Sequence, residues 1–301
     1  MTTHLSPPSV VVISFSSRDL LKPCLDALGA IPIPETIVVD NASTDGSADL
    51  VRTQFPHVHL IENQTNVGFG VAANQGVKAC HGRFAMILNP DCILEPGTLD
   101  SLSALVEAEP HLGAVGPRLI NMDGSLQQSI KKLPSPLNFL TSLFGFANWV
   151  NTHQLGFSGA VTQPTDVEVV SGAAMLVRRD AWEEIGGMDE GFFLYFEDLD
   201  ICRRLRRIGW RIVYHPHARA RHQWGASTTQ FHEISHPAFV SAAVRYYHKH
   251  YGPLAGVVIQ AVLLLRELVH LTISLTHPFQ ANWGAHIRAA KNALAFPTAL
   301  K

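Results

Sequence analysis

The sequence of 301 residues is short of cysteine and of charge. Its four cysteines, at positions 24, 80, 92 and 202, are far apart and form no CxxC pair. This spacing argues against a structural zinc site or a redox-active pair and fits a reducing compartment. Charged residues make up 16% of the chain and the net charge is −2. That balance gives no reason to expect a nucleic-acid partner held by phosphate contacts.

The sequence also lacks targeting and metalloprotease signals. Its N-terminus, MTTHLSPPS, has no basic start and no long apolar run, so we expect no signal peptide and a cytoplasmic protein. No HExxH motif occurs among the sixteen histidines, and we expect most of them to be surface or packing residues. Hydrophobic residues make up 47%, which is apolar for a soluble protein but does not indicate many membrane spans.

Strand and helix patterns alternate through the first 110 residues. Apolar and β-branched runs predict strands at 10–15, 36–40, 58–62 and 84–88, and helical patterns follow at 19–28, 47–55, 67–80 and 98–109. This order predicts an α/β fold with a mostly parallel central sheet and helices on both sides. Ligands of such sheets bind at the carboxyl ends of the strands, where Asp40, Asn66 and Asp91 lie.

Beyond residue 114 the alternation loosens. Asp123-Gly124 is typical of a hairpin turn. Further strands are expected at 166–170, 173–178 and 211–214, and a helix is expected to begin near Glu197. From about residue 235 the pattern is helical throughout.

Two polar segments follow the second and third expected strands. VVDNASTDGS places Asp40 and Asn41 at a strand end, where they suit a nucleobase or ribose; the alternative is a loop that caps the next helix. NVGFGVAANQG offers Gly68, Gly70 and Ala73 as half of a dinucleotide-binding fingerprint, although residues 63–66 separate it from the strand. These glycines either let backbone N–H groups approach a diphosphate or permit close helix–sheet packing.

The segment FAMILNPDCILEPG ends a buried strand with Asn89, Pro90 and Asp91. Mg²⁺ and Mn²⁺ are hard cations, and Mg²⁺ is often held by one or two carboxylates plus substrate phosphates. Asp91 therefore qualifies as part of a metal site that a nucleotide diphosphate completes, and a plain Asn-Pro turn is the alternative. His222, in ARARHQWGAS, is either a metal or phosphate ligand or a strand-end histidine.

A second candidate site begins the helix expected near Glu197. On a helical wheel Asp198 shares the apolar face, at offsets of three, four and seven residues from Ile201, Cys202 and Leu205. An inward carboxylate without a cation partner is a candidate general base, and stabilisation of the helix N-terminus is the alternative. Asp200 faces arginines, so we expect it to form a solvated ion pair.

Together these segments resemble the inverting family-2 glycosyltransferases of the GT-A fold, in particular their bacterial rhamnosyltransferase-like branch. The resemblance covers about residues 8–225. It rests on the order and spacing of VVISFSS, VVDNASTDGS, NVGFGVAANQG, LNPDC, SGAAMLVRR, GGMDEGFFLYFEDLDICRRLRRIGWRIVYHPHARARH and the trailing GAS. It implies a GT-A domain at 1–225, with a nucleotide-sugar half at about 8–120 and an acceptor and catalytic half at 121–225. A helical extension would follow at 226–301.

The resemblance also implies a role for each matching residue. The donor would lie along Ser14, Phe15, Asp40, Asn41, Asn66, Gly70, Asn74, Asn89 and Asp91. Asp91 would bind a divalent metal, Mg²⁺ or Mn²⁺, with His222 as a further ligand. Asp198 would be the catalytic base.

Two departures from the family pattern shape the expected reaction. The usual Asp-x-Asp reads Asn89-Pro90-Asp91, so one carboxylate is missing. The Gln-x-x-Arg-Trp motif of processive synthases is absent, so we expect one sugar per event. The resemblance implies inverting transfer from a nucleotide-sugar, with dTDP-rhamnose favoured, to a hydroxyl of a lipid-linked saccharide of the cell envelope. A catalytically inactive sugar-nucleotide-binding or scaffold protein and an NAD-dependent oxidoreductase are the alternatives.

The stretch from Leu254 to Leu275 is apolar but is interrupted by Arg266 and Glu267, which makes it a poor bilayer-spanning segment. A helical wheel gathers its polar residues on one side: Gln260, Arg266, Glu267, His270 and Ser274. Such a helix lies in a membrane interface, docks onto the body of the protein or docks onto a second subunit. Peripheral membrane attachment and oligomerisation therefore stay open.

Overall fold

The structure, a computed structural model, describes residues 7–141, 161–223, 231–276 and 283–295. The GAS motif of the sequence analysis lies outside these residues. The chain divides into two compact units. The first comprises Met1–Leu133, Gln154–Glu190 and Glu197–Trp224, and the second comprises Pro134–His153, Gly191–Phe196 and Gly225–Lys301. The second unit thus takes two short segments from within the region expected to form the first domain.

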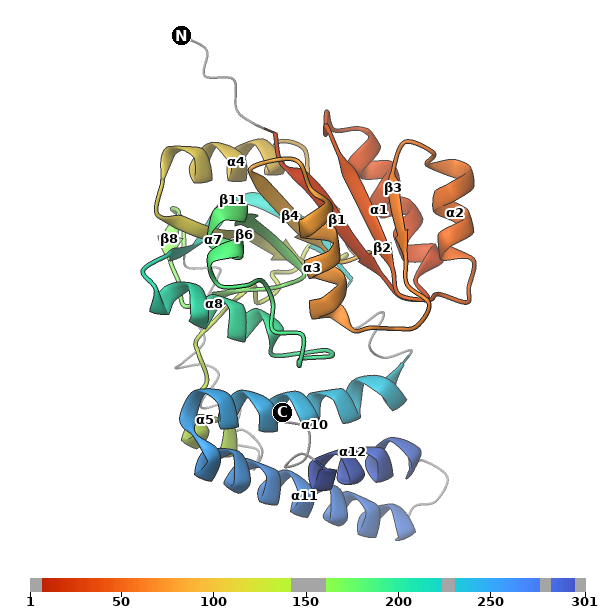
Figure 1. The fold of residues 1–301 in the computed structure, drawn as a ribbon, viewed down its shortest axis with the longest axis vertical. Helices are drawn as coiled ribbons and strands as arrows, with labels where there is room; N and C mark the ends of the chain where they lie inside the picture. The colour runs from red at the N-terminus through yellow and green to blue at the C-terminus, as the bar shows by residue number, and fades with distance from the viewer. Residues whose placement is uncertain (1–6, 142–160, 224–230, 277–282, 296–301) are drawn as a thin grey trace. The chain divides into compact units, whose positions relative to one another are not determined.

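A sheet of nine strands forms the centre of the first unit (Figure 1). Its strands are β1 (Ser9–Ser14), β2 (Thr36–Asp40), β3 (His59–Glu62), β4 (Phe84–Leu88), β5 (Cys92–Leu94), β6 (Leu112–Ile120), β8 (Thr165–Asp166), β10 (Ala174–Arg178) and β11 (Arg211–His222). Their order is β3-β2-β1-β4-β10-β6-β11-β5, with β8 paired to β11. The first four strands are parallel, whereas β10 runs antiparallel to both of its neighbours.

Two of the expected strands differ from the observed ones. The strand expected at 166–170 is two short strands, because β8 joins the large sheet while β9 (Val169–Val170) pairs with β7 (Ile130–Lys131). The strand expected at 211–214 continues to His222 as β11. Its register on β6 shifts between His215 and Arg219, which interrupts the alternation that a sequence pattern needs.

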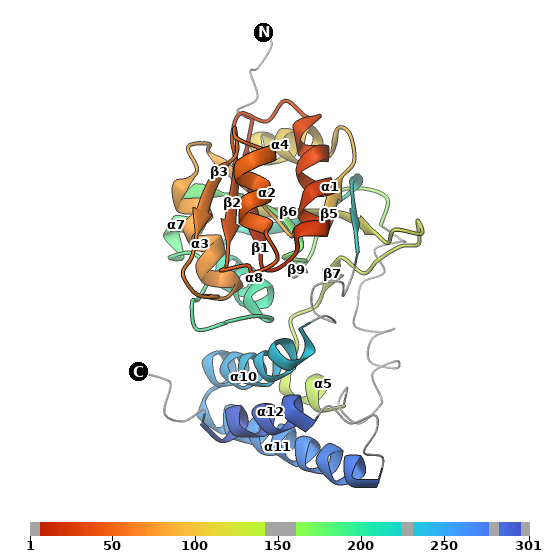
Figure 2. The same cartoon turned by 90° about the vertical axis from the view of Figure 1, so that its right-hand side faces the viewer.

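Helices cover both faces of the sheet, as the sequence predicts. They are α1 (Arg18–Gly29), α2 (Ser47–Gln54), α3 (Phe69–Ala79), α4 (Thr98–Ala108), α7 (Arg179–Glu184) and α8 (Glu197–Arg207). A Cβ atom on Gly76 of α3 would lie 2.2 Å from Cγ1 of Val11 and 3.2 Å from Cγ2 of Val39. Val10 and Val12 instead pack with α1, α2 and α4. Because side chains alternate along a strand, α3 covers the face opposite to those three helices, as Figure 2 shows.

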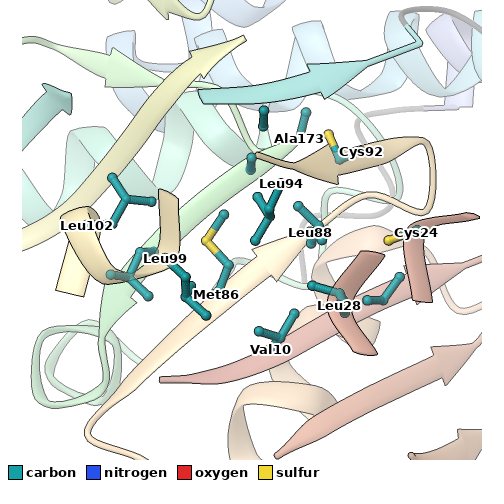
Figure 3. Packing of buried hydrophobic residues seen from close by; sticks show 14 of the residues in the cluster. Val10, Cys24, Leu28, Met86, Leu88, Cys92, Leu94, Leu99, Leu102 and Ala173 are labelled. Carbon is teal, nitrogen blue, oxygen red and sulfur yellow. The ribbon is translucent and has the colours of Figure 1, made fainter. Parts of the chain in front are cut away.

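The core on the α1 and α4 side is built from buried aliphatic residues and cysteines of both layers. Figure 3 shows part of it: Val10, Cys24, Leu28, Met86, Leu88, Cys92, Leu94, Leu99, Leu102 and Ala173. The described cysteines are all free and buried, which agrees with the absence of a CxxC pair. This core continues to the end of β4 and so gives the polar residues that follow β4 a rigid base.

The second unit contains α5 (Pro136–Thr141), α10 (His232–Tyr251), α11 (Pro253–Thr276) and α12 (Trp283–Ala295). Aromatic rings hold its separate segments together. The ring of Phe139 in α5 lies 5.0 Å from that of Tyr247, and the ring of Phe196 lies 5.3 Å from that of Tyr246. Tyr246 and Tyr247 are fully buried on α10, so this helix carries the aromatic core of the unit.

Helix α11 turns its polar side inward. Ile259, Leu263 and Glu267 are fully buried, whereas Leu254 is 78% exposed and Leu265 is 59% exposed. By length and composition alone, α11 is the one helix in the described part of the chain that could cross a membrane, over Pro253–Thr272. The helical wheel of the sequence analysis is therefore correct in its two sides, and the apolar side is the exposed one.

Candidate active site

The carboxyl ends of β1 and β2 form the first part of the candidate site. Ser14 and Asp40 lie opposite each other in the register of these parallel strands. Asp40 is 2% exposed, and its Oδ2 accepts the N–H of Ser43 at 2.9 Å. Its Oδ1 is buried and accepts no hydrogen bond within the described ranges. Burial raises the pKa of Asp40. A buried acceptor without a donor suits an N–H or O–H group of a ligand.

The neighbouring polar side chains mainly position loops. Ser14 Oγ lies 2.9 Å from Ser17 Oγ, and Asn66 accepts the N–H of Gly68 at 3.0 Å. Asn41 donates to the carbonyl of Gly68 at 3.3 Å and accepts from Asn63 at 2.8 Å. Asn41 therefore ties the end of β2 to the start of α3. Phe15, half-buried, follows directly after β1.

Along α3, Gly70 is buried near the helix start, and Asn74 lies one turn further on. The Asn74 amide donates to the carbonyl of Met188 at 2.9 Å and accepts the Met188 N–H at 2.9 Å. A Cβ on Gly187 would come within 2.4 Å of Asn74 Oδ1, so only glycine fits there. Among the described residues, Asn74 therefore forms hydrogen bonds with the loop before α8, and not with residues at the carboxyl end of β2, where Asp40 lies.

The described residues include several strained backbone conformations. The described non-glycine residues with positive φ are Ser16 (φ 44°), Ala42 (φ 60°), Tyr195 (φ 70°) and Phe196 (φ 64°). The first two follow β1 and β2, and the other two directly precede α8. Such conformations cost about 1–3 kcal/mol each and concentrate at functional sites.

Asp91 and His222 come together after β4 and at the end of β11. The antiparallel pairing of β5 with β11 places His222 opposite Cys92. Nε2 of His222 lies 3.3 Å from Oδ1 of Asp91, and both side chains are buried. The sequence analysis named these two residues as one metal pair, and they are neighbours although 131 positions separate them.

Hydrogen bonds orient the His222 ring for a ligand role. Nδ1 of His222 lies 2.7 Å from Oε1 of Gln127, whose amide nitrogen donates to Asn121 at 2.9 Å. Nδ1 therefore donates, and the lone pair of a neutral ring on Nε2 faces Asp91. Oδ1 of Asp91 is buried and accepts no hydrogen bond from the described residues. Two facing acceptors fit a divalent cation between or beside them.

Cys92 lies next to this pair, and its sulfur belongs to the same group of potential ligand atoms. Burial, and then the charge of Asp91, raise the pKa of the Cys92 thiol well above its ordinary value. The carboxylate oxygen of Asp91 suits Mg²⁺ or Mn²⁺, which prefer oxygen ligands to sulfur.

Asp198 lies at the start of α8 and is 7% exposed. Its Oδ2 accepts from Nζ of Lys131 at 2.8 Å and lies 3.5 Å from the N–H of Gly172. The expectation that Asp198 lacks a cation partner is wrong. Lys131 comes from β7, 67 positions earlier, where a helical wheel of α8 cannot show it.

Glu197, next to Asp198, is also buried, and its Oε2 has no hydrogen-bond partner in the described part of the chain. Burial, followed by the charge of Asp198, raises the pKa of Glu197 to about 8. At neutral pH Glu197 therefore keeps its proton.

Asp200 forms the expected ion pair with an arginine of its helix, but the expectation that this pair is solvated is wrong. Its side chain is fully buried and accepts from Nε of Arg204 at 2.7 Å. Arg204 also donates to the carbonyls of Ile185 at 2.8 Å and Gly187 at 2.6 Å. The pair fixes the loop before α8, so it is structural rather than a solvated surface pair.

Two short connections join the metal pair to Asp198. In the first, the N–H of Asn89 donates to the carbonyl of Ala173 at 2.9 Å, next to Gly172, which approaches Asp198. In the second, the segment 127–131 contacts His222 through Gln127 and Asp198 through Lys131. Two backbone segments thus connect the surroundings of Asp91 with those of Asp198.

A comparison with models of known protein families identifies the family of this chain. The model described as glycosyltransferase like family 2 matches residues 7–239. The chain belongs to this family. The enzyme is therefore a glycosyltransferase, and the oxidoreductase alternative, which rested on Gly68, Gly70 and Ala73, is dropped.

Relatives of this glycosyltransferase include rhamnosyltransferases. It is 31% identical over 236 residues to the N-acetylglucosaminyl-diphospho-decaprenol L-rhamnosyltransferase of Mycobacterium tuberculosis, covering 73% of this chain and 76% of that one. It is 25% identical to the rhamnosyltransferase WbbL of Escherichia coli, covering 71% and 82%.

Solved structures show the GT-A fold. The mannosyltransferase PcManGT of Pyrobaculum calidifontis, solved with GDP-Man and Mn²⁺, aligns with a TM-score of 0.58 at 17% identity, covering 99% of this chain and 89% of that chain. TarS of S. aureus, residues 1–349, aligns with a TM-score of 0.53 at 14% identity, covering 96% and 90%.

Sequence reasoning missed three residues of the glycosyltransferase site: Gln127, Lys131 and Gly172. The first two are four positions apart, a spacing that puts both on one side of an extended segment. That spacing was the available signal, but nothing local shows which partners they contact. Gly172 has a role because a Cβ there would lie 3.3 Å from Cβ of Asp198.

Glu197 predicts a pH dependence of stability. Its pKa rises from 4.5 to about 8 on folding, so between these values the folded state holds a proton that the unfolded state releases. The free energy of unfolding contributed by this group therefore falls as pH rises from about 5 to about 8. We expect the Tm of the wild type to fall more steeply over this range than that of Glu197→Gln. Parallel Tm curves for the two proteins would contradict the assignment.

Proposed function

We propose that this glycosyltransferase transfers one sugar per event from a nucleotide-sugar to an acceptor hydroxyl, with inversion at the anomeric carbon. The favoured donor is dTDP-rhamnose, in line with the rhamnosyltransferases among its relatives. The observation that carries the proposal is the pair of connections between Asp198 and the Asp91–His222 pair. These contacts support a common site for the candidate base and the candidate metal ligands.

The donor nucleoside would lie over the ends of β1 and β2, where Asp40 offers its free oxygen. Asp91 and His222 would hold Mg²⁺ or Mn²⁺ beside the diphosphate. The bound cation would offset the charge that develops on the leaving diphosphate. Asn89, whose backbone is fixed to Ala173, would border the same ligand.

Asp198 would act as the base. Its carboxylate accepts the proton of the acceptor hydroxyl while that oxygen forms a bond to the anomeric carbon. The bond from this carbon to the diphosphate oxygen breaks with its electron pair, which leaves with the diphosphate. Lys131 and the N–H of Gly172 orient the carboxylate, so the base does not have to be ordered when the acceptor binds.

The acceptor would be a lipid-linked saccharide of a cell-envelope polymer. This follows from the relative whose name gives N-acetylglucosaminyl-diphospho-decaprenol as its acceptor. The alternative, an inactive binding protein, would bind the donor and turn none of it over. Intact Asp91, Asp198 and His222 favour the enzyme.

Exchange of the base tests the mechanism. Asp198→Asn keeps the shape but cannot accept the proton, and general-base assistance contributes about 10²–10⁴-fold in rate. We expect turnover to fall by that order while donor affinity stays nearly unchanged. Turnover, donor affinity and Tm are measured together.

Asp200→Asn is the comparison variant. It removes one partner of a buried pair, which typically costs about 3–5 kcal/mol, so we expect a lower Tm instead of a specific loss of turnover. Wild-type turnover in Asp198→Asn would refute the assignment of the base. So would a folded Asp200→Asn protein with the greater loss of turnover.

Removal of the metal ligand tests donor binding. We expect Mn²⁺ to strengthen binding of dTDP or UDP to the wild type, and Asp91→Ala to lose that gain, because Asp91 would help to hold the cation that attracts the diphosphate. Titration calorimetry in Mn²⁺ and in chelator measures both. Asp26→Ala, at an exposed carboxylate on α1, is the control and should behave as wild type. If the wild type and Asp91→Ala both bind the nucleotide equally well with and without Mn²⁺, the proposal that a metal takes part in donor binding is wrong.

We also infer that the exposed apolar side of α11 rests on the membrane surface that carries a lipid-linked acceptor. Leu254, Leu265 and Leu268 are each at least half exposed on this side. Contiguous exposed apolar side chains indicate contact with lipid or protein. Docking onto a second subunit is the competing explanation.

Vesicle binding separates these explanations. Full-length wild type should co-sediment with anionic vesicles at low salt. Leu265→Glu/Leu268→Glu should lower its partition by about tenfold or more, because burying one leucine contributes about 1.5–3 kcal/mol. Ile208→Glu, at a 48% exposed residue of the first unit, is the matched control. If the wild type stays in solution, or the double variant sediments equally well, interfacial binding is wrong.

A further inference from the structure

The second unit contains a cluster of histidines around one carboxylate, unrelated to the candidate active site. His236 of α10 donates from Nε2 to Oε2 of Glu267 in α11 at 2.9 Å. His286 of α12 donates from Nδ1 to the same oxygen at 2.6 Å. One ligand atom from each of the three residues lies within 4.8 Å of the other two. Each residue comes from a different helix, so the cluster joins all three.

Glu267 is the unusual member of this cluster. Its side chain is fully buried on α11, whereas the neighbouring Leu268 is half exposed. Its second oxygen, Oε1, is buried and has no hydrogen-bond partner among the residues that the structure describes. The carboxyl group is therefore buried, and only one of its two oxygens has hydrogen-bond partners among the described residues.

We propose that His236, Glu267 and His286 form a binding site for a divalent transition-metal ion, with Zn²⁺ as the best match. Two imidazole nitrogens and one carboxylate are a donor set that proteins use for Zn²⁺, with a fourth position left for another ligand. A cation would satisfy the carboxylate, and it would replace the two N–H donors that now converge on one oxygen. The histidines would bind it as neutral rings, so metal binding releases any proton that they share with Glu267.

Further contacts around the cluster hold its three residues in place. The ring of His270 stacks on His286 with centroids 5.2 Å apart, and the ring of His232 stacks on His236 at 5.3 Å. On α12, Arg288 donates to Glu233 Oε2 at 2.5 Å and to its carbonyl at 3.2 Å. That carbonyl loses its helical donor because Pro237 has no N–H. Polar contacts beside the cluster thus fix α12 on α10 and hold the ligand residues in place.

The ligand chemistry separates this site from the Asp91–His222 pair. Imidazole-rich sites favour Zn²⁺, Co²⁺ and Ni²⁺, whereas carboxylate and phosphate oxygens suit Mg²⁺ and Mn²⁺. A metal at His236, Glu267 and His286 would crosslink α10, α11 and α12. It would thereby fix the helix whose apolar side is exposed, without taking part in sugar transfer.

Cobalt binding tests the proposal. Untagged full-length protein is stripped with chelator and titrated with Co²⁺ in excess Mg²⁺ and nucleoside diphosphate, so that Mg²⁺ competes for the Asp91–His222 pair. We expect one Co²⁺ per chain with the visible absorption of a four-coordinate ion, displaced by one equivalent of Zn²⁺. Zn²⁺ should also raise the Tm of the wild type by mass action.

Three variants complete the experiment. Glu267→Gln and His286→Asn should lose the cobalt absorption and the Zn²⁺-dependent rise in Tm. His81→Asn removes one member of the exposed His81–Glu35 pair, which has no second histidine in contact, and should keep both. Absence of the absorption in the wild type overturns the proposal whether or not the variants fold. Equal binding by a folded Glu267→Gln protein overturns it as well, and the cluster is then a hydrogen-bond network only.

Discussion

The antiparallel pairing of β10 with β4 is the constraint on which the candidate active site depends. Ala174 lies opposite Leu88, so the beginning of β10 meets the carboxyl end of β4. A parallel strand in this place would have put its beginning at the far edge of the sheet. Because β10 is reversed, Gly172 and Ala173 lie beside Asn89 and also reach Asp198. One strand direction thus brings the base next to the residues that follow β4.

Burial and hydrogen-bond partners give the three neighbouring carboxyl groups of α8 different roles. Asp200 forms an ion pair with Arg204, and Arg204 also donates hydrogen bonds to two backbone carbonyls. The pair therefore has a structural role. Asp198 has a partner, Lys131, whose side chain is 39% exposed and can therefore move more freely than Arg204. Oε2 of Glu197 has no hydrogen-bond partner among the described residues, and burial raises the pKa of this group to about 8. Residue type alone does not separate these three neighbours on α8; the elements packed against them do.

The alternating strands and helices of the first 110 residues were predictable because each element is local and its pattern is regular. Their observed ends differ from the predicted ones by at most two residues, and those of β2 and β4 coincide with them. Small differences arise because helix ends fray and strand patterns do not mark their last residue. The grouping of Asp40 and Asp91 at one edge followed from parallel topology, and family resemblance added His222. Lys131 and Gln127 were not predictable, since their partners are 67 and 95 positions away. The burial of Asp200 was missed because a helical wheel ranks faces by composition and cannot show which loop covers a face.

Helix α11 is a second case in which a helical wheel does not show which side of a helix is buried. Its wheel correctly separates a polar from an apolar side, and the usual rule would bury the apolar one. Here α10 and α12 offer His236 and His286 to the polar side, and Glu267 can be buried only where such partners exist. Because the side of α11 that carries Glu267 packs against α10 and α12, Leu265 and Leu268 on the other side are exposed. The exposed apolar surface of the second unit is therefore a consequence of how its interior satisfies one buried charge.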